Sequence, residues 1–208
     1  EQILTFFDEE EWFEPSNLEV EIQDEIYEGF IELSNQLQFQ EYYLLEFRSG
    51  GVFGPNAFAL PGGIVVLTDE LVDASETVEE VLAVLAHEIG HVELRHTMRS
   101  ILQNSIVAAA AAAITSDAAS LSVAVSSLPV LVAQRKYSRE FESAADDYAF
   151  DLLMQHGYSP AAFASIMERL SARRGARSSS FSYFSTHPAT EQRVENARKA
   201  AADDTTEP

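Results

Sequence analysis

The stretch His87-Glu88-Ile89-Gly90-His91 decides how this sequence is interpreted. Its two histidines are four residues apart, about one helical turn, so on a helix they project from the same face. Two neutral imidazoles one turn apart can bind the same zinc ion. The carboxylate of Glu88 follows the first histidine and can reach a water at the metal, which suits a general base. The motif therefore predicts a catalytic zinc site carried by a helix.

The residues around the motif have the pattern of a helix with one buried face. Apolar side chains recur there at spacings of three and four residues. These apolar positions are Val78, Leu82, Leu85, Ile89 and Val92. Thr77, with Glu80 three residues later, predicts a capping box at the start of the helix. The competing interpretation is a helix whose two histidines are only solvated or buried in the core. That interpretation would be preferred for a lone histidine, but the four-residue spacing of a pair argues against it.

A catalytic zinc site usually has three protein ligands and an open position, so we expect a third ligand elsewhere in the chain. Glu142 and Asp146 are also four residues apart, in a second predicted helix. If the two helices cross, Glu142 can bind the metal while Asp146 accepts the other ring N–H of a ligand histidine. Glu140 and Asp147 are the alternative carboxylates, but neither has a partner spaced for both roles. Without the upstream histidines, an acidic solvated helix face would be the preferred interpretation.

Four stretches, taken in order, resemble the HtpX-like and CaaX-prenyl-protease-type zinc metallopeptidases, a branch of the gluzincins. They are residues 56–63, 87–91, 138–146 and 185–190, the last followed by an arginine. The resemblance implies one Zn²⁺ per chain, bound by His87, His91 and Glu142. It also implies that Glu88 is the general base and that Asp146 supports the site behind a ligand. The assignment made from spacing and the pattern of the family agree.

Residues 53–60 and 64–68 have the composition of two short strands around a Pro-Gly-Gly turn at 61–63. We therefore expect an α+β fold, a mostly helical zincin-type domain with a small, mainly antiparallel sheet beside the active-site helix. An exposed edge strand there can bind an extended peptide through its main chain. The residues that match such a substrate-binding edge in the resembled family are Asn56, Ala57, Phe58 and Ala59. The alternative is an ordinary hairpin that supports the helix.

His187 is the third histidine with a candidate role. Pro188 is suited to open a helix, so this segment could be only a terminal packing helix. The resembled family carries a His-Pro step followed by an arginine, which brings the segment to the rim of the site. His187 could then stabilise the oxyanion, or occupy the open metal position and keep an enzyme latent. We expect Arg193 to pair with an acidic residue of the site, and His96 and His156 to be structural.

The composition is that of an enzyme domain. A chain of 208 residues with 46% hydrophobic residues can bury one substantial core, so we expect one catalytic domain over residues 1–208. The net charge of −21 argues against a nucleic-acid partner, because phosphates would be repelled. The chain has no cysteine, which excludes a disulfide framework and thiolate zinc ligands.

Two segments differ in character from the rest. Residues 1–40 form an acidic segment, predicted to be helical, which contains no lysine or arginine. Residues 101–134 are rich in alanine, and their uncharged runs are shorter than the roughly 20 apolar residues of a membrane span. We expect a helical hairpin or lid there, with peripheral membrane association as one possibility.

The sequence thus predicts a zinc metalloendopeptidase that acts on polypeptides, with Glu88 as the base. By analogy with the resembled family, we expect a periplasmic or cell-envelope location and a role in envelope protein quality control. The alternative is a chaperone-like or binding module that contains zinc at a latent or inactive site. Cleavage of an unfolded protein separates these hypotheses, because both predict a bound metal.

Overall fold

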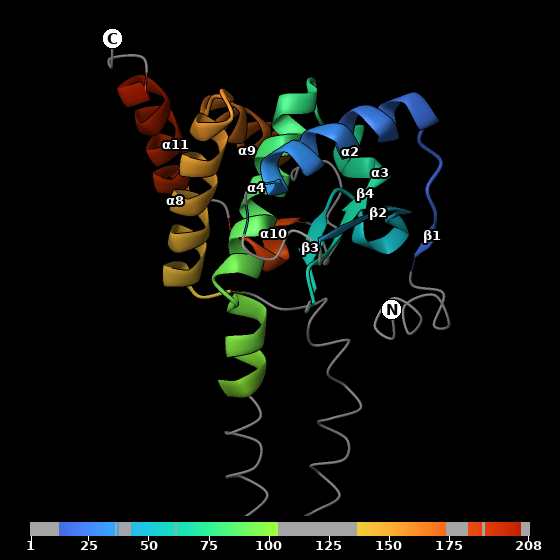
Figure 1. The fold of residues 1–208 in the computed structure, drawn as a ribbon, viewed down its shortest axis with the longest axis horizontal. Coiled ribbons are helices and arrows are strands. Elements are labelled where there is room, and N and C mark those ends of the chain that lie inside the picture. Colours follow the sequence, from blue (N-terminus) through green and yellow to red (C-terminus); the bar gives the residue numbers. More distant parts are fainter. Residues whose placement is uncertain are drawn as a thin grey trace, which may run out of the picture.

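The computed structural model describes residues 13–35, 37, 43–60, 62–103, 137–173, 183–188 and 190–204. Its helices are α2 (Val20–Ser34), α3 (Asp69–Val72), α4 (Val78–Glu93), α8 (Arg139–Gln155), α9 (Ala161–Arg173), α10 (Tyr183–Thr186) and α11 (Glu191–Asp204). Its strands are β1 (Glu14–Pro15), β2 (Leu44–Ser49), β3 (Ala57–Ala59) and β4 (Ile64–Thr68), with a short 3₁₀ turn η2 at Gly51–Phe53. The described part is a mostly helical α+β fold, which confirms the predicted fold class (Figure 1).

The sheet is small and mixed, with the strand order β1-β2-β4-β3. β1 is antiparallel to β2, and β3 is antiparallel to β4, whereas the central pair β2 and β4 is parallel. Between β3 and β4 the backbone turns through Gly62 and Gly63, whose φ angles are 92° and 85°. L-residues with a side chain rarely adopt such angles, so the turn needs glycine at these positions. The order leaves β3 at one end of the sheet.

Helix α4 carries the histidine motif through the middle of the molecule. Thr77 is its N-cap, and its hydroxyl accepts a hydrogen bond from the Glu80 amide at 3.3 Å, as the sequence predicts. The second half of the capping box differs, because the Glu80 side chain accepts from the amide of Glu76. α4 packs against α8 on one side and against β3 on the other, with α2 and α9 also in contact with it (Figure 1). Neighbours on several sides bury the motif.

A glycine of α4, Gly90, lies directly against the backbone of α8. A Cβ placed on Gly90 would lie 2.9 Å from the carbonyl oxygen of Ala145 and 3.2 Å from its Cα. Both neighbouring atoms belong to backbone, which has little freedom to move away. Gly90 therefore lets α8 lie directly against the face of α4 that carries the histidines.

The N-terminal part of the chain is held differently from the sequence-based expectation. The pattern of Ser16 followed by Glu19 predicts a capping box for the first helix. Instead, Glu19 is the N-cap of α2 and makes no side-chain capping bond. The Ser16 hydroxyl donates to Asp69 at 2.7 Å, and the amide of Asn17 donates to the other oxygen of the same carboxylate. The hydroxyl of Ser16 thus bonds to a residue 53 positions away in the sequence and does not complete a capping box with Glu19.

Parts of two predicted segments lie outside the described residues. These are residues 1–12 and 36–40, apart from Leu37, of the acidic segment, and residues 104–134 of the predicted alanine-rich hairpin or lid. Within the described part of the chain, no helix is long and apolar enough to cross a membrane.

Candidate metal centre

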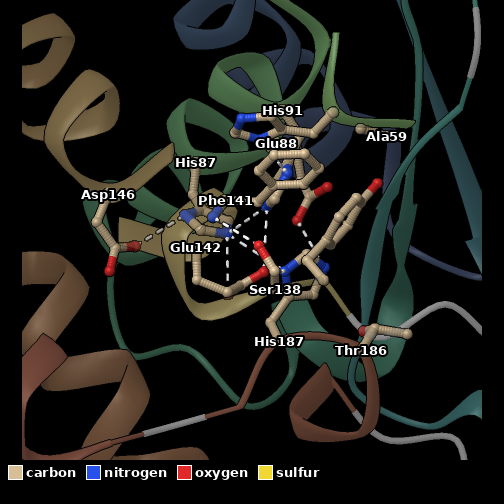
Figure 2. Close-up of polar contacts among 12 residues, drawn as sticks. Ala59, His87, Glu88, His91, Ser138, Phe141, Glu142, Asp146, Thr186 and His187 are labelled. Carbon is tan, nitrogen blue, oxygen red and sulfur yellow. Dashed lines mark hydrogen bonds and ion pairs between the residues drawn. The ribbon is translucent and has the colours of Figure 1, made fainter. Parts of the chain in front are cut away.

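Four side chains from three separate regions converge on one point. They are His87 and His91 of α4, Glu142 of α8 and His187 after α10, and one ligand atom from each lies within 4.8 Å of all the others. All four residues are at most 3% exposed. Figure 2 shows them pointing toward one another from their separate elements. The structure therefore brings together the predicted pair of histidines, the predicted distant glutamate and the third histidine.

The donor–donor distances in this cluster, which involve both oxygens of Glu142, are close to those around a metal ion. Zinc–ligand bonds of about 2.0–2.1 Å place the donor atoms of a regular tetrahedron about 3.4 Å apart. Nε2 of His87 lies 3.0 Å from Nε2 of His91, 3.2 Å from Nδ1 of His187 and 3.7 Å from Oε2 of Glu142. Oε1 of Glu142 lies 3.4 Å from Nε2 of His91 and 3.1 Å from Nδ1 of His187. The donor set of imidazole and carboxylate suits zinc.

The outer ring nitrogens of His87 and His91, which face away from this point, have partners that leave the inner nitrogens free to bind a metal. Nδ1 of His87 lies 2.9 Å from Asp146, and Nδ1 of His91 lies 3.0 Å from Nδ1 of His96. When those outer nitrogens carry the ring protons, both Nε2 atoms present lone pairs at 3.0 Å separation. Lone pairs at that distance repel, and a cation between them removes the repulsion. The residues present therefore fit a divalent metal ion.

Asp146 and Arg193, the two residues predicted to support the site, lie beside the cluster and contact each other. Two guanidinium nitrogens of Arg193 donate to the two carboxylate oxygens of Asp146, at 2.6 and 2.7 Å. Nη1 of the same guanidinium lies 2.7 Å from Glu142 and donates to the backbone carbonyl of Pro188 at 3.0 Å. Burial acts to raise the pKa of Asp146, but His87 and Arg193 outweigh it and hold that pKa below its usual value. Arg193 thus joins α11 to both carboxylates of α8.

Glu88 lies beside the cluster but faces it differently from the four ligand candidates. Its side chain is fully buried, and neither carboxylate oxygen has a hydrogen-bond partner among the described residues. Nε2 of His187 lies 3.4 Å from Oε1 of Glu88 (Figure 2). Burial raises the pKa of Glu88, while nearby His187 and His87 act in the opposite direction. A buried carboxylate with a raised pKa has the properties of a proton acceptor.

The pKa values of Glu142 and His187 are shifted in opposite directions. Burial acts to raise the pKa of Glu142, but the imidazoles of His187, His91 and His87 hold it well below its usual value. Burial acts to lower the pKa of His187, but the carboxylates of Glu142 and Glu88 raise it above the usual range. Without a metal, His187 therefore tends to be protonated between two carboxylates.

His91 has two neighbours that the sequence does not reveal as parts of the site. Tyr137 stacks on its ring, with centroids 3.9 Å apart, and His96 contacts its outer nitrogen. His96 is assigned a structural role from the sequence, and burial lowers its pKa to about 4. A histidine five residues after the motif is the only signal in the sequence, since its approach depends on a sharp turn at Arg95, whose φ is 54°.

Three of the four residues predicted for the substrate edge, Ala57, Phe58 and Ala59, form strand β3, which lies at the end of the sheet in contact with α4. Its side chains are buried, so an approaching peptide would meet its backbone. The Asn56 side chain accepts a hydrogen bond from the Ala57 amide, which fixes the entry to the strand. The carbonyl of Ala59 accepts from Thr97, whose hydroxyl also contacts the phenol of Tyr137 at 2.7 Å.

The site combines a His-Glu-x-x-His helix with a glutamate from a second helix, beside a small sheet. This combination is typical of metallopeptidases. The comparison with protein families agrees. The chain belongs to peptidase family M48, whose model matches residues 25–201. This finding confirms the resemblance drawn from the four sequence stretches.

Curated relatives are similar over most of this chain. Metalloprotease LoiP of Escherichia coli (strain K12) is 37% identical over 147 residues, which is 69% of this chain and 57% of that protein. Metalloprotease YcaL of the same strain is 33% identical over 151 residues, 71% of this chain and 58% of that protein. The beta-barrel assembly-enhancing protease of that strain is 30% identical over 156 residues, 70% of this chain and 32% of that protein. The chain thus matches little more than half the length of the first two relatives.

Proposed function

We propose that the chain is a zinc-dependent endopeptidase, with one Zn²⁺ held by His87, His91 and Glu142. The observation that carries the proposal is the spacing of their donor atoms, 3.0 to 3.7 Å, at a buried point beside Glu88. Zinc bound there would supply Lewis acidity, polarising a peptide carbonyl and making nearby water more acidic. An extended polypeptide bound along β3 would bring a scissile bond to this point.

Glu88 would carry out the proton transfers of hydrolysis, while Asp146 and Arg193 would hold a zinc ligand in place. Glu88 takes a proton from the attacking water as the new C–O bond forms. It then delivers this proton to the nitrogen of the leaving amine as the C–N bond breaks. Asp146 holds the ring of His87 through its outer nitrogen, and Arg193 holds Asp146. Burial of Glu88 supports the role of base, because it raises the affinity of the carboxylate for protons.

The experiment is cleavage of casein by the zinc-loaded protein, with and without a chelator. We expect a chelator to stop cleavage and zinc to restore it. Glu88→Gln should lower turnover about 10²- to 10⁴-fold or more while zinc content is unchanged. Glu79→Gln, an exposed glutamate on the same helix, is the matched control and should cleave at the rate of the wild type. Full turnover by Glu88→Gln would refute the base assignment.

We further propose that this arrangement is a latent state of the enzyme. His187 supports this, because its Nδ1 lies 3.2 Å from Nε2 of His87 and 3.1 Å from Oε1 of Glu142, where it would occupy the position that water and substrate need. We expect His187→Ala to speed casein cleavage, with His156→Ala as a control distant from the cluster. Slower cleavage with unchanged zinc content would instead favour oxyanion stabilisation. A zinc-loaded protein that is inactive in every variant would favour the binding module.

We also propose that the substrates are unfolded polypeptides of the cell envelope and that the protein acts in their quality control. The name of one relative, the beta-barrel assembly-enhancing protease, supports this assignment. The test compares cleavage of an unfolded outer-membrane β-barrel protein with cleavage of the same protein after folding. Equal cleavage of both forms would contradict a role in quality control.

A further inference from the structure

His96 lies behind the candidate ligand His91, on the side away from the metal point. Helix α4 ends at Glu93, and the next residues turn through Arg95, which has a left-handed backbone with φ of 54°. This conformation is rare for a residue with a side chain, and it interrupts the helix between Glu93 and His96. The turn brings the ring of His96 back to His91, with Nδ1 of one ring 3.0 Å from Nδ1 of the other.

The direction of this hydrogen bond follows from the position of the other ring nitrogen. Nε2 of His91 faces the donor atoms of His87 and Glu142, at 3.0 and 3.4 Å. For Nε2 to bind a metal it must be free of a proton, so the proton of the neutral ring is on Nδ1. Nδ1 of His91 then donates, and Nδ1 of His96 accepts. The remaining ring proton of His96 is therefore on Nε2.

The ring of His96 is held in place by packing. It stacks on Phe141, with centroids 4.2 Å apart and an angle of 6° between the planes. The residue is only 1% exposed. Because Phe141 directly precedes Glu142 at the start of α8, the same stack connects the end of α4 to the second ligand-bearing helix. His96 is thus fixed relative to ligands on both helices.

We infer that His96 is a positioning residue for the metal site, which holds His91 in the orientation and tautomer needed for metal binding. The inference rests on the zinc site of the proposed function. In this arrangement, each ligand histidine of α4 has its own acceptor for the proton on its outer ring nitrogen. The acceptor is the carboxylate of Asp146 for His87 and the neutral imidazole of His96 for His91. Outer partners of this kind change metal affinity about 10- to 100-fold when they are removed.

The test measures the dissociation constant for zinc by competition with a chromophoric chelator. His96→Leu removes the acceptor and should weaken zinc binding about 10- to 100-fold. His96→Asn can place its amide oxygen where Nδ1 lies and should restore most of the affinity. His156→Leu is the matched control. The side chain of His156 is at the other end of α8, where its Nδ1 lies 4.0 Å from Glu32. The zinc affinity of this variant should equal that of the wild type.

Two outcomes would overturn the inference while the proposed function stands. One is a folded His96→Leu protein that binds zinc as tightly as the wild type. The other comes from nitrogen NMR of the zinc-loaded wild type, which needs no variant: a ring proton on Nδ1 of His96 would exclude it as the acceptor. If the wild type itself does not bind zinc, the proposed function fails first. If His96→Leu only lowers the unfolding temperature of the metal-free protein, without changing the zinc affinity, the role is structural and the inference is wrong.

Discussion

Replacing Gly90 by alanine tests whether the close approach of α4 and α8 builds the metal centre. The added Cβ would lie 2.9 Å from the carbonyl oxygen of Ala145 and 3.2 Å from its Cα. Ordinary contacts begin near 3.5 Å, so the helices must separate by about 0.5 Å. Such overpacking costs about 1–3 kcal/mol, and the better helix propensity of alanine offsets about 1 kcal/mol. We expect a net loss of about 0–2 kcal/mol in the free energy of unfolding.

The effect on the metal should be larger than the effect on stability. Glu142 and Asp146 are on either side of Ala145 in the sequence of α8, so a shift at Ala145 displaces both carboxylates. A displacement of about 0.5 Å exceeds the tolerance of about 0.2 Å for zinc–ligand distances. We therefore expect Gly90→Ala to bind zinc about 10-fold more weakly or worse.

Gly29→Ala is the matched control, because it makes the same substitution in a helix that packs on α4. Its Cβ would lie 2.7 and 2.8 Å from the two methyl groups of Leu82, which are the ends of a side chain and not backbone. Its unfolding free energy can change, but its zinc affinity should not. The assays are urea unfolding of the metal-free proteins and titration with zinc against a competing chelator. Zinc binding by Gly90→Ala within twofold of the wild type would refute the reasoning.

Two further changes test the electrostatics of the site. Because the pKa of Glu88 is raised on folding, its contribution to stability is present below the ordinary pKa of 4.5 and is lost as pH rises through the raised value. In the metal-free protein, Glu88→Gln should therefore gain stability over the wild type as pH rises from 5 to 8, measured by thermal unfolding; parallel curves would contradict this. Arg193→Lys loses the paired hydrogen bonds to Asp146, so the free energy of unfolding measured in urea should fall by about 1–3 kcal/mol. Arg198→Lys is the control on the same helix. It changes an exposed ion pair with Glu168 and should alter the free energy of unfolding by about 0–1 kcal/mol. Equal losses in these two variants would show that the buried pair has no special role.

The parts of the fold set by local rules could be predicted from the sequence. The start of α4 at Thr77, the bounds of β4 and the four-residue spacing of both ligand pairs follow from capping, turn chemistry and helix periodicity. The choice of Glu142 as the third ligand follows from the spacing on α8, which repeats that on α4, and from the resemblance to the zinc metallopeptidases. The signals for the helix start, the strand and the spacing lie within a few residues of the feature, whereas the meeting of Glu142 with the histidines joins two separate helices.

The features that were missed depend on contacts between distant residues or on strain. The hydroxyl of Ser16 has a local capping role available, but the carboxylate of Asp69 satisfies both it and the following amide. The parallel pairing of β2 with β4 needs the chain to cross over through η2 and β3, which no periodicity encodes. The position of His96 depends on a left-handed residue that is not glycine, for which local propensity gives no warning.

The charges of the site explain why it needs a cation and predict a measurable consequence. The carboxylates of Glu88, Glu142 and Asp146 are buried with the guanidinium of Arg193, an excess of two negative charges among these groups. A divalent ion balances that excess. In the metal-free protein, protons on Glu88 and His187, whose pKa values are both raised, can balance it instead.

Zinc binding should therefore expel protons from the site. We expect about one to two protons released per zinc near pH 6.5, measured by calorimetry in buffers of different ionisation enthalpy. Glu88→Gln and His187→Ala should each release fewer protons, because each removes one site that holds a proton before the metal arrives. Zinc binding with no proton release in the wild type would mean that the metal-free site stays charged, and the balance argued from its buried carboxylates would be wrong.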